Sequence, residues 1–279
     1  MPVLDAVWIW YTATVGGLAV VLGGGAPGGA PYRYALIHAG IAVAAVLLRI
    51  ALRRSAPWTA RWARGSFTLA ALPVVFSSIG LVLPVLHPEP FEWTWLAADR
   101  ALFGRDPTIA LQGLLVPALT EVLQWVYAAF YLIPIAVVLA SARRRDARGF
   151  DHSLVTITFC FMLSYLGYFL WPTLPPYRFL EHAPLQGLWL TDALHAWIDG
   201  AELNHWDCFP SGHTMLSVVA LVMAWRHARA LFWVLLPVAA LLVFSTVALR
   251  YHYVCDVLAG LAAVVPGIWL SDRLLAPNQ

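Results

Sequence analysis

The chain has 279 residues, of which 61% are hydrophobic and 11% are charged, and its mean hydropathy is +0.73. Because about a quarter of the residues in a soluble globular domain are charged, this composition excludes a soluble globule and predicts a polytopic membrane protein. The net charge of +2 is too small, and the arginines are too scattered, to indicate a nucleic-acid partner.

Apolar runs along the chain predict eight transmembrane helices. The first run, 6–24, has no basic segment before it, so we expect a retained span rather than a cleaved signal peptide. The other spans are expected at about 35–52, 67–86, 116–140, 153–171, 211–226, 230–249 and 252–270. The predicted fold class is therefore an all-α polytopic membrane bundle with short interfacial helices in its loops.

Two loops are rich in arginine and predict the orientation of the bundle. Residues 49–64 contain five arginines and residues 142–151 contain four. By the positive-inside rule both loops are cytoplasmic. Counting spans from these loops puts both chain termini in the cytoplasm and the loops at the other end of the bundle outside the cell.

A tryptophan-rich segment, 87–115, precedes the fourth span. Within it, 94–103 is expected to form an amphipathic helix that lies on the membrane surface. Three charged residues nearby are expected to be ordinary surface groups: Arg100, Arg105 and Asp106. Glu121, near the outer end of the fourth span, is either a functional residue or the partner of a loop arginine.

A second polar segment, 172–207, alternates prolines with aromatic residues. Pro175 and Pro176 argue against a helix and predict a rigid extended strap that could hold Arg178 over a site. Asp207 lies near Ser211 in the sequence, but the pattern assigns it no role. Three histidines of this segment are expected to be surface groups: His182, His195 and His205.

Two motifs place a histidine at the outer mouth of an apolar run. The first is C-F-P-S-G-H-T at 208–214, where Ser211 can cap a helix and Gly212 allows a ligand to approach the backbone closely. The free N–H groups of such a helix start favour an anion. The helix that follows is short, because Arg226 comes only about 22 Å beyond Ser211, so the site is expected slightly below the outer surface.

The second motif is R-Y-H-Y-V-C-D at 250–256. His252 and Asp256 are four residues apart, so on a helix they share one face, and the carboxylate can hold the imidazole with Nε2 pointing forward. An imidazole held in this way can act as a nucleophile or as a base.

C-F-P-S-G-H-T and R-Y-H-Y-V-C-D-V-L-A-G resemble the second and third signature motifs of the type 2 phosphatidate phosphatase superfamily. The resemblance covers roughly residues 70–272. It implies that His252 attacks phosphorus to give a phosphohistidine, that Asp256 orients it and that His213 protonates the leaving oxygen. It also implies phosphate contacts from three neighbouring residues: Pro210, Ser211 and Gly212.

The chain departs from the common phosphatases at their cationic positions. It contains no lysine, and Ser245-Thr246 stands where the third motif usually has Ser-Arg. The nearest counterpart of the first motif, G-Y-F-L-W-P-T-L-P-P-Y-R-F at 167–179, resembles the branch with inositol phosphorylceramide synthases. A site with fewer cations suits a singly charged phosphodiester. Arg178 and Arg250 are then the expected phosphate clamps, with Tyr177 as a further substrate contact.

These features predict one integral membrane domain over 1–279. Residues 66–272 are expected to form a six-helix phosphatase-like core, and 1–65 to add two transmembrane helices. The favoured function is transfer of a phospho-head group between lipid or polyol hydroxyls at the extracytoplasmic face. The alternative is hydrolysis of phosphatidate-like or polyprenyl phosphates. A transporter, or a lipid-binding protein without catalysis, is the remaining alternative.

Neither a cofactor nor a metal is expected. The three cysteines, Cys160, Cys208 and Cys255, lack metal-binding spacing, and a Cys208–Cys255 disulfide is left open. No carboxylate cluster suits Mg²⁺. The expected partners are the lipid bilayer and a phospholipid or polyprenyl phosphate substrate, while the sequence does not determine an oligomeric state.

Overall fold

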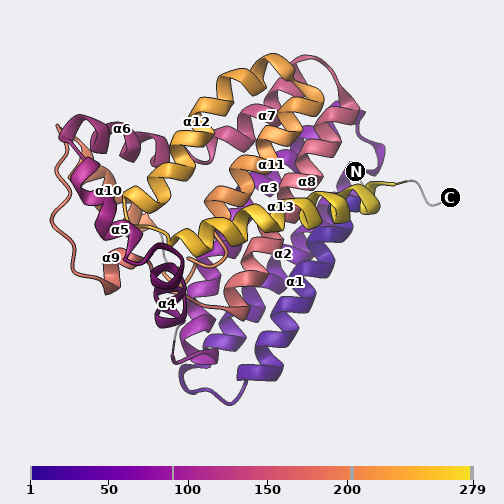
Figure 1. Cartoon of the computed structure of the whole chain (residues 1–279). Helices are drawn as coiled ribbons and strands as arrows, with labels where there is room; N and C mark the ends of the chain where they lie inside the picture. Colours follow the sequence, from indigo (N-terminus) through magenta and orange to yellow (C-terminus); the bar gives the residue numbers. More distant parts are fainter. Residues whose placement is uncertain (1, 90, 202–203, 277–279) are drawn as a thin grey trace.

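The structure is a computed structural model that describes residues 2–89, 91–201 and 204–276. Within these ranges the chain is helical and forms no β-sheet, its β pairing being a single parallel bridge between Thr173 and Asp207. The all-α prediction is confirmed. Figure 1 shows long helices packed side by side, with short helices gathered at one end of the bundle.

Each of the eight predicted spans contains a long helix or a helix pair. Among the described residues, six helices are long and apolar enough to cross a membrane: α1 (Pro2–Gly23), α2 (Ala30–Ala51), α3 (Pro57–Leu86), α8 (Ala147–Leu170), α12 (Arg229–Ala248) and α13 (Val254–Leu275). The bent pair α6 (Pro117–Ala128) and α7 (Leu132–Arg143) can form a seventh span. The sixth predicted segment is α11 (Gly212–His227), whose 16 residues span about 24 Å.

Two of the long helices differ from the sequence prediction. The fourth span is not continuous, because α6 and α7 meet at an angle of 52°. Pro134 has no N–H to donate to the carbonyl of Phe130, which explains a break at this point. Helix α3 begins at Pro57, ten residues before its expected start, and therefore carries Arg61 and Arg64 on its first turns.

Four short helices lie between the long ones: α4 (Glu92–Phe103), α5 (Pro107–Ala110), α9 (Pro176–Phe179) and α10 (Thr191–Ala201). The prediction that Pro175 and Pro176 exclude a helix is wrong, because α9 begins at Pro176. Proline is tolerated at the first helical position, where its missing N–H would have no helical partner. The expected surface helix at 94–103 is α4, although its Asp99 is buried.

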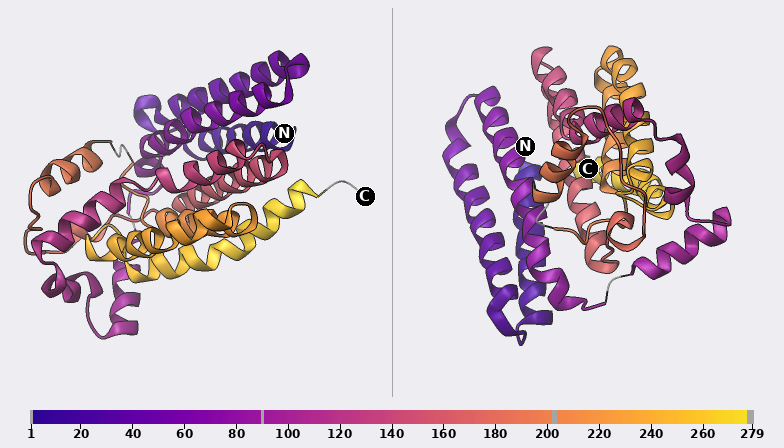
Figure 2. Two further views of the ribbon diagram at one scale, coloured as in Figure 1. Left: turned by 90° about the horizontal axis from the view of Figure 1, so that it is seen from above. Right: turned by 90° about the vertical axis from the view of Figure 1, so that its left-hand side faces the viewer.

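Helix α8 is the centre of the bundle. It packs against α3 and α7 and also against α11 and α13. Figure 2 shows α1, α2 and α3 on one side of α8, and α12 and α13 on the other. The chain therefore brings the start of α11 and the start of α13 to the same end of the bundle, where the short helices lie (Figure 1).

The N-terminal helices are tied to the bundle by a buried ion pair. Arg64 of α3 donates two hydrogen bonds to the Asp5 carboxylate of α1, at 2.7 and 2.8 Å, and both side chains are at most 10% exposed. Such a pair contributes little when intact, but removing one partner leaves a buried charge without compensation.

Replacing Asp5 by alanine is expected to lower the free energy of unfolding by about 3–5 kcal/mol, because the Arg64 guanidinium stays charged and buried. The midpoint of thermal unfolding in detergent measures this loss. The control is Asp151→Ala, which breaks a more exposed pair with Arg61 and should cost about 1 kcal/mol or less. Equal losses in the two variants would contradict a special role for Asp5.

Candidate active site

The two motif histidines, 39 residues apart in sequence, are in contact. Nε2 of His252 lies 3.4 Å from Nδ1 of His213, and the ring centroids are 5.6 Å apart. His213 is on the first turn of α11, whereas His252 precedes α13. The expectation that His252 and Asp256 lie on one face of the same helix is wrong, because α13 begins only at Val254 and His252 lies before it.

The backbone of the first motif orients His252. Its Nδ1 lies 3.0 Å from the Cys208 carbonyl oxygen and 3.5 Å from Oδ2 of Asp256. A carbonyl oxygen can only accept, so Nδ1 carries the proton and Nε2 is left with its lone pair facing His213. The nearer partner is thus Cys208, and the Asp256 carboxylate adds a second, longer contact.

Asp256 also stabilises the start of α13. Its Oδ2 accepts a hydrogen bond from the Tyr253 N–H at 2.9 Å, and the carboxylate is completely buried. Its other oxygen, Oδ1, has no hydrogen-bond partner among the described residues. A buried acceptor in this state is costly, so Asp256 keeps one unsatisfied oxygen in the buried region beside His252.

Aromatic rings hold His213 from the other side. Its imidazole stacks on Tyr127 of α6, with centroids 4.5 Å apart and planes at 24°, and contacts Phe130 at 4.4 Å. Tyr127 in turn stacks on Tyr251 of the second motif. The bend between α6 and α7 therefore lies beside the site, a role that apolar periodicity could not reveal.

Small residues allow the helices of the site to approach one another. Ser211 caps α11 as predicted, with Oγ accepting from the Thr214 N–H at 3.3 Å. A Cβ on Gly212 would lie 2.6 Å from the Tyr168 hydroxyl, and one on Gly260 of α13 would lie 2.5 Å from the Ser211 carbonyl oxygen. Pro210 packs against α8 at Gly167, where a side chain would not fit.

The predicted phosphate clamps do not contact the histidines. Arg250 has a left-handed backbone with φ of 70°, is buried, and donates from Nη1 to the Ala183 carbonyl oxygen at 2.6 Å. Arg178 pairs with Asp199 and donates from Nε to the Tyr177 hydroxyl at 3.0 Å. Both arginines thus bond to residues of the 172–207 segment. Arg250 and Tyr177 also line a separate cavity of about 660 Å³ with His182 and His195.

The segment 172–207, which we call the strap, nevertheless connects both histidine motifs. The Cys208 N–H donates to the Thr173 carbonyl oxygen at 3.3 Å, and the Tyr177 N–H donates to the Arg250 carbonyl oxygen at 3.1 Å. Burial lowers the pKa of Arg250. The strap therefore fixes the backbone on either side of the site, even though Arg178 and Arg250 bond to other residues.

Asp207 lines the cavity that contains His213. This cavity has a volume of about 310 Å³ and is also bordered by Gly212, Tyr127 and Tyr168. Burial raises the pKa of the Asp207 carboxyl to about 6, with the imidazole of His252 acting in the opposite direction. The site thus has carboxyl groups close to its histidines, while its arginines bond to Asp199 and to the Ala183 carbonyl oxygen.

Two acidic residues outside the motifs anchor the surrounding loops. Asp99 of α4 accepts hydrogen bonds from the Val254 and Cys255 N–H groups, both at 2.9 Å, and so caps α13. Glu121 accepts from the backbone at 188–191 and from the Thr191 hydroxyl. It therefore pairs with no arginine but holds the start of α10, which carries Ile198 over the cavity.

One group of three side chains could in principle hold a metal ion within the described ranges: ligand atoms of Cys208, His252 and Asp256 lie within 4.8 Å of one another. However, the Cys208 thiol donates to the Tyr251 carbonyl oxygen at 3.0 Å, and Nδ1 of His252 donates to Cys208. The donors are thus engaged in positioning the site. None of the three cysteines forms a disulfide in the structure.

The pH dependence of stability should reveal Asp207. Its pKa is raised from about 3.9 in the unfolded chain to about 6 in the folded protein, because burial disfavours the charged carboxylate. The free energy of unfolding should therefore be highest below about pH 4, where the carboxyl is protonated, and should fall as the pH rises through 6. The neutral isostere Asp207→Asn should flatten the thermal midpoint over this window and raise it above about pH 7.

Asp199→Asn is the control for this measurement. The Tyr177 hydroxyl and Arg178 lower the pKa of the Asp199 carboxyl, so this substitution should reduce stability above about pH 7. If the Asp207→Asn protein keeps the wild-type slope between about pH 4 and 6, the carboxyl at 207 is not the group that titrates there.

Comparison with known proteins identifies the family. A family model described as the PAP2 superfamily matches residues 93–270, nearly two thirds of the chain. No curated protein and no solved structure matches the chain. The matched region begins after α3, so the inclusion of α3 in the core predicted from residue 66 stays a prediction. The match contains both histidine motifs, and the chain belongs to the PAP2 superfamily, also called the type 2 phosphatidate phosphatase superfamily.

Proposed function

We propose that the protein transfers a phospho-head group between lipid or polyol hydroxyls through a phosphohistidine intermediate. The observation that carries this proposal is the contact between the unprotonated Nε2 of His252 and Nδ1 of His213, which lie 3.4 Å apart. Membership of a family of lipid phosphatases and phosphotransferases supports the general chemistry. The additional step to head-group transfer rests on the charges around the site.

In the first half-reaction, Nε2 of His252 attacks phosphorus and forms an N–P bond, while the P–O bond to the leaving alcohol breaks. His213 gives its proton to the departing oxygen. In the second half-reaction, an acceptor hydroxyl attacks phosphorus, His213 takes the hydroxyl proton, and the N–P bond breaks. The start of α11 favours the developing negative charge.

The contact between the two rings implies a movement on substrate binding. At 3.4 Å the ring nitrogens leave no space for a phosphoryl group between them. His252 is fixed through Nδ1, whereas His213 is held by stacking on Tyr127 and Phe130. Stacking restrains a ring less directionally than a hydrogen bond, so we assign the movement to His213.

The charges favour a phosphodiester substrate. Asp207 and Asp256 lie near His252, while Arg178 is paired with Asp199 and Arg250 is bonded to the strap. A monoester brings nearly two negative charges into this site and a diester brings one, so repulsion is smaller for the diester. A transferred head group requires a diester donor.

Hydrolysis of a phosphate monoester is the second candidate, and one observation favours it. The buried Nε of Arg250 has no hydrogen-bond partner among the described residues. An unsatisfied buried donor is costly, and a phosphate oxygen would satisfy it if the strap shifted. This candidate differs from the first in its donor, which is a monoester, and in its acceptor, which is water.

The distribution of arginine indicates the side of the membrane on which the proposed site lies. Twelve of the seventeen arginines lie at the end of the bundle opposite the histidines: Arg49, Arg53, Arg54, Arg61, Arg64, Arg143, Arg144, Arg145, Arg148, Arg226, Arg229 and Arg273. The positive-inside rule makes that end cytoplasmic. The proposed site is then extracytoplasmic, and both termini are cytoplasmic.

The purified protein should be incubated with a panel of labelled phospholipids, with and without a lipid or polyol hydroxyl acceptor. We expect a new phospho-lipid product that depends on the acceptor. Release of inorganic phosphate from a monoester, without dependence on an acceptor, would establish hydrolysis instead. Absence of turnover with every donor would overturn both candidates.

The roles of the two histidines can be separated by the leaving group. His213→Ala should slow turnover of an alkyl phosphodiester by about 10²–10⁴, because the leaving alkoxide needs a proton. A p-nitrophenyl phosphodiester has a good leaving group, so the same variant should lose far less with it. His252→Ala should be inactive with both esters and should form no phosphohistidine, which is recognised as labelled protein that survives base and loses its label in acid.

The assignment has a clear opposite result. If His213→Ala loses the same factor with both esters, His213 does not act as the general acid. If His252→Ala keeps activity with either ester, His252 is not the nucleophile. Thermal unfolding of each variant provides the check that the fold is intact.

A further inference from the structure

An apolar groove runs from the histidine site along the side of the bundle. The cavity that contains His213 adjoins a second cavity of about 140 Å³ that reaches Trp62, near the arginine-rich end. Four residues line both cavities: Leu69, Pro73, Tyr131 and Phe161. We call the two together the α3–α7 groove.

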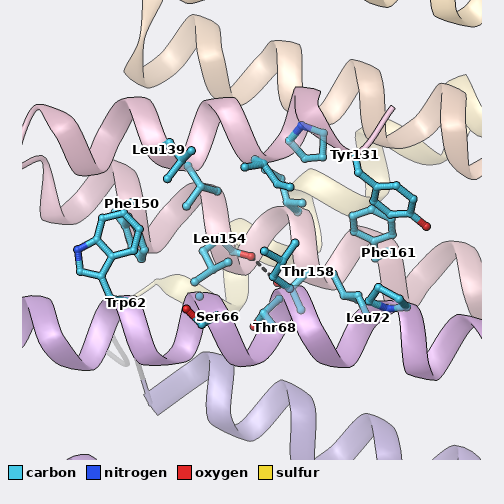
Figure 3. Close-up of a pocket in the computed structure, with 17 residues that line it drawn as sticks. Trp62, Ser66, Thr68, Leu72, Tyr131, Leu139, Phe150, Leu154, Thr158 and Phe161 are labelled. Carbon is cyan, nitrogen blue, oxygen red and sulfur yellow. Dashed lines mark hydrogen bonds between the residues drawn. The ribbon is translucent and has the colours of Figure 1, made fainter. Parts of the chain in front are cut away.

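Three helices build this groove. Helices α3 and α7 each pack on α8 but make little contact with each other, so α8 forms the floor between them. Figure 3 shows Trp62 and Leu72 on α3, Leu139 on α7, and Phe150, Leu154 and Phe161 on α8 around this space. The groove is therefore open on the side that faces the lipid.

The cavity that reaches Trp62 presents mainly hydrocarbon, and two of its polar side chains are engaged in hydrogen bonds. The Thr158 hydroxyl donates to the Leu154 carbonyl oxygen at 2.6 Å, and the Thr68 hydroxyl accepts from the Trp8 indole N–H at 3.1 Å. The walls are otherwise largely aliphatic and aromatic. Such a surface provides no recognition for a head group and favours an alkyl chain.

The length of the groove exceeds one leaflet. From Phe76 beside the histidine site to Trp62, helix α3 advances fourteen residues, or about 21 Å. One leaflet of a hydrocarbon core about 30 Å thick provides about 15 Å. The groove therefore suits one chain held extended by the protein.

We propose that the α3–α7 groove binds one long hydrocarbon chain of the lipid phosphate substrate while the phosphate lies at the two histidines. This inference rests on the proposed function, because it takes the site at His213 as the place of the head group. Helix α3 lies outside the region that matches the family. Because α3 forms one wall of the groove, it limits the length of the chain that fits there.

Gly65 offers a substitution that shortens the groove. A Cβ at this position would lie 3.6 Å from Cζ of Phe150 and 3.9 Å from Cδ2 of Leu154, which are ordinary contacts. Alanine therefore fits without strain, whereas the ring of Gly65→Phe would occupy the end of the groove near Trp62. Gly65→Ala is the matched control.

The assay compares donors that share one head group and differ in acyl length, together with a chainless p-nitrophenyl phosphodiester. Each pair of buried methylenes contributes about tenfold to affinity. Gly65→Phe should therefore lower kcat/KM for the longest chain by about tenfold or more, with little change for the shortest chain and the chainless ester. Gly65→Ala should keep the wild-type profile.

Leu139→Trp, on the opposite wall, is a second variant that should show the same dependence on chain length. A uniform loss for all donors, or full activity with the longest chain in both folded variants, would overturn the proposal. Thermal unfolding identifies variants that have simply lost their fold.

Binding must be measured apart from turnover. A lipid phosphate with a photoreactive diazirine at the end of its acyl chain should label α3 or α7 near Trp62 and Leu139 in the wild type, and label them less in Gly65→Phe. Labelling without any turnover would leave the groove assigned and remove the proposed function. Turnover with neither labelling nor dependence on chain length would support the proposed function and overturn the assignment of the groove.

Discussion

The site depends on the hydrogen bond from Nδ1 of His252 to the carbonyl oxygen of Cys208. This bond, 3.0 Å long, joins the two histidine motifs and determines that Nε2 is the unprotonated nitrogen of the His252 ring. Cys208 is itself held, because its thiol donates to the Tyr251 carbonyl oxygen and its N–H donates to Thr173. The start of α11, the start of α13 and the strap are thus parts of one hydrogen-bonded unit, to which Asp99 adds the cap of α13.

Close helix packing makes that hydrogen bond possible. Gly212 admits the Tyr168 hydroxyl of α8, and Gly260 admits the Ser211 carbonyl oxygen, at distances that a Cβ would not allow. Because α11 and α13 are this close, two imidazoles from separate segments can meet within a protein that is otherwise apolar. A larger residue at either glycine would move the helix start, and with it the ring, rather than a side chain alone.

Hydropathy predicted the helices because a bilayer requires about twenty apolar residues for each span and leaves few alternatives. It did not predict the bend after α6 or the early start of α3, because a proline within an apolar run and a polar first turn that includes Arg61 and Arg64 carry no clear hydropathy signal. The motifs indicated which histidines meet. They could not reveal the stacking of Tyr127 on His213, because that contact comes from a segment 86 residues away in sequence with no chemical signature of its own.

The two arginines expected to bind phosphate have other partners in the structure, and this bears on the kind of substrate the site suits. Arg178 and Arg250 were expected as clamps because they flank the motifs, yet the structure pairs Arg178 with Asp199 and bonds Arg250 to Ala183. Bringing Arg178 to a phosphate would break an existing pair, so the gain is reduced by the loss of that pair. A substrate that carries one charge, and takes much of its binding free energy from a buried chain, does not need that exchange.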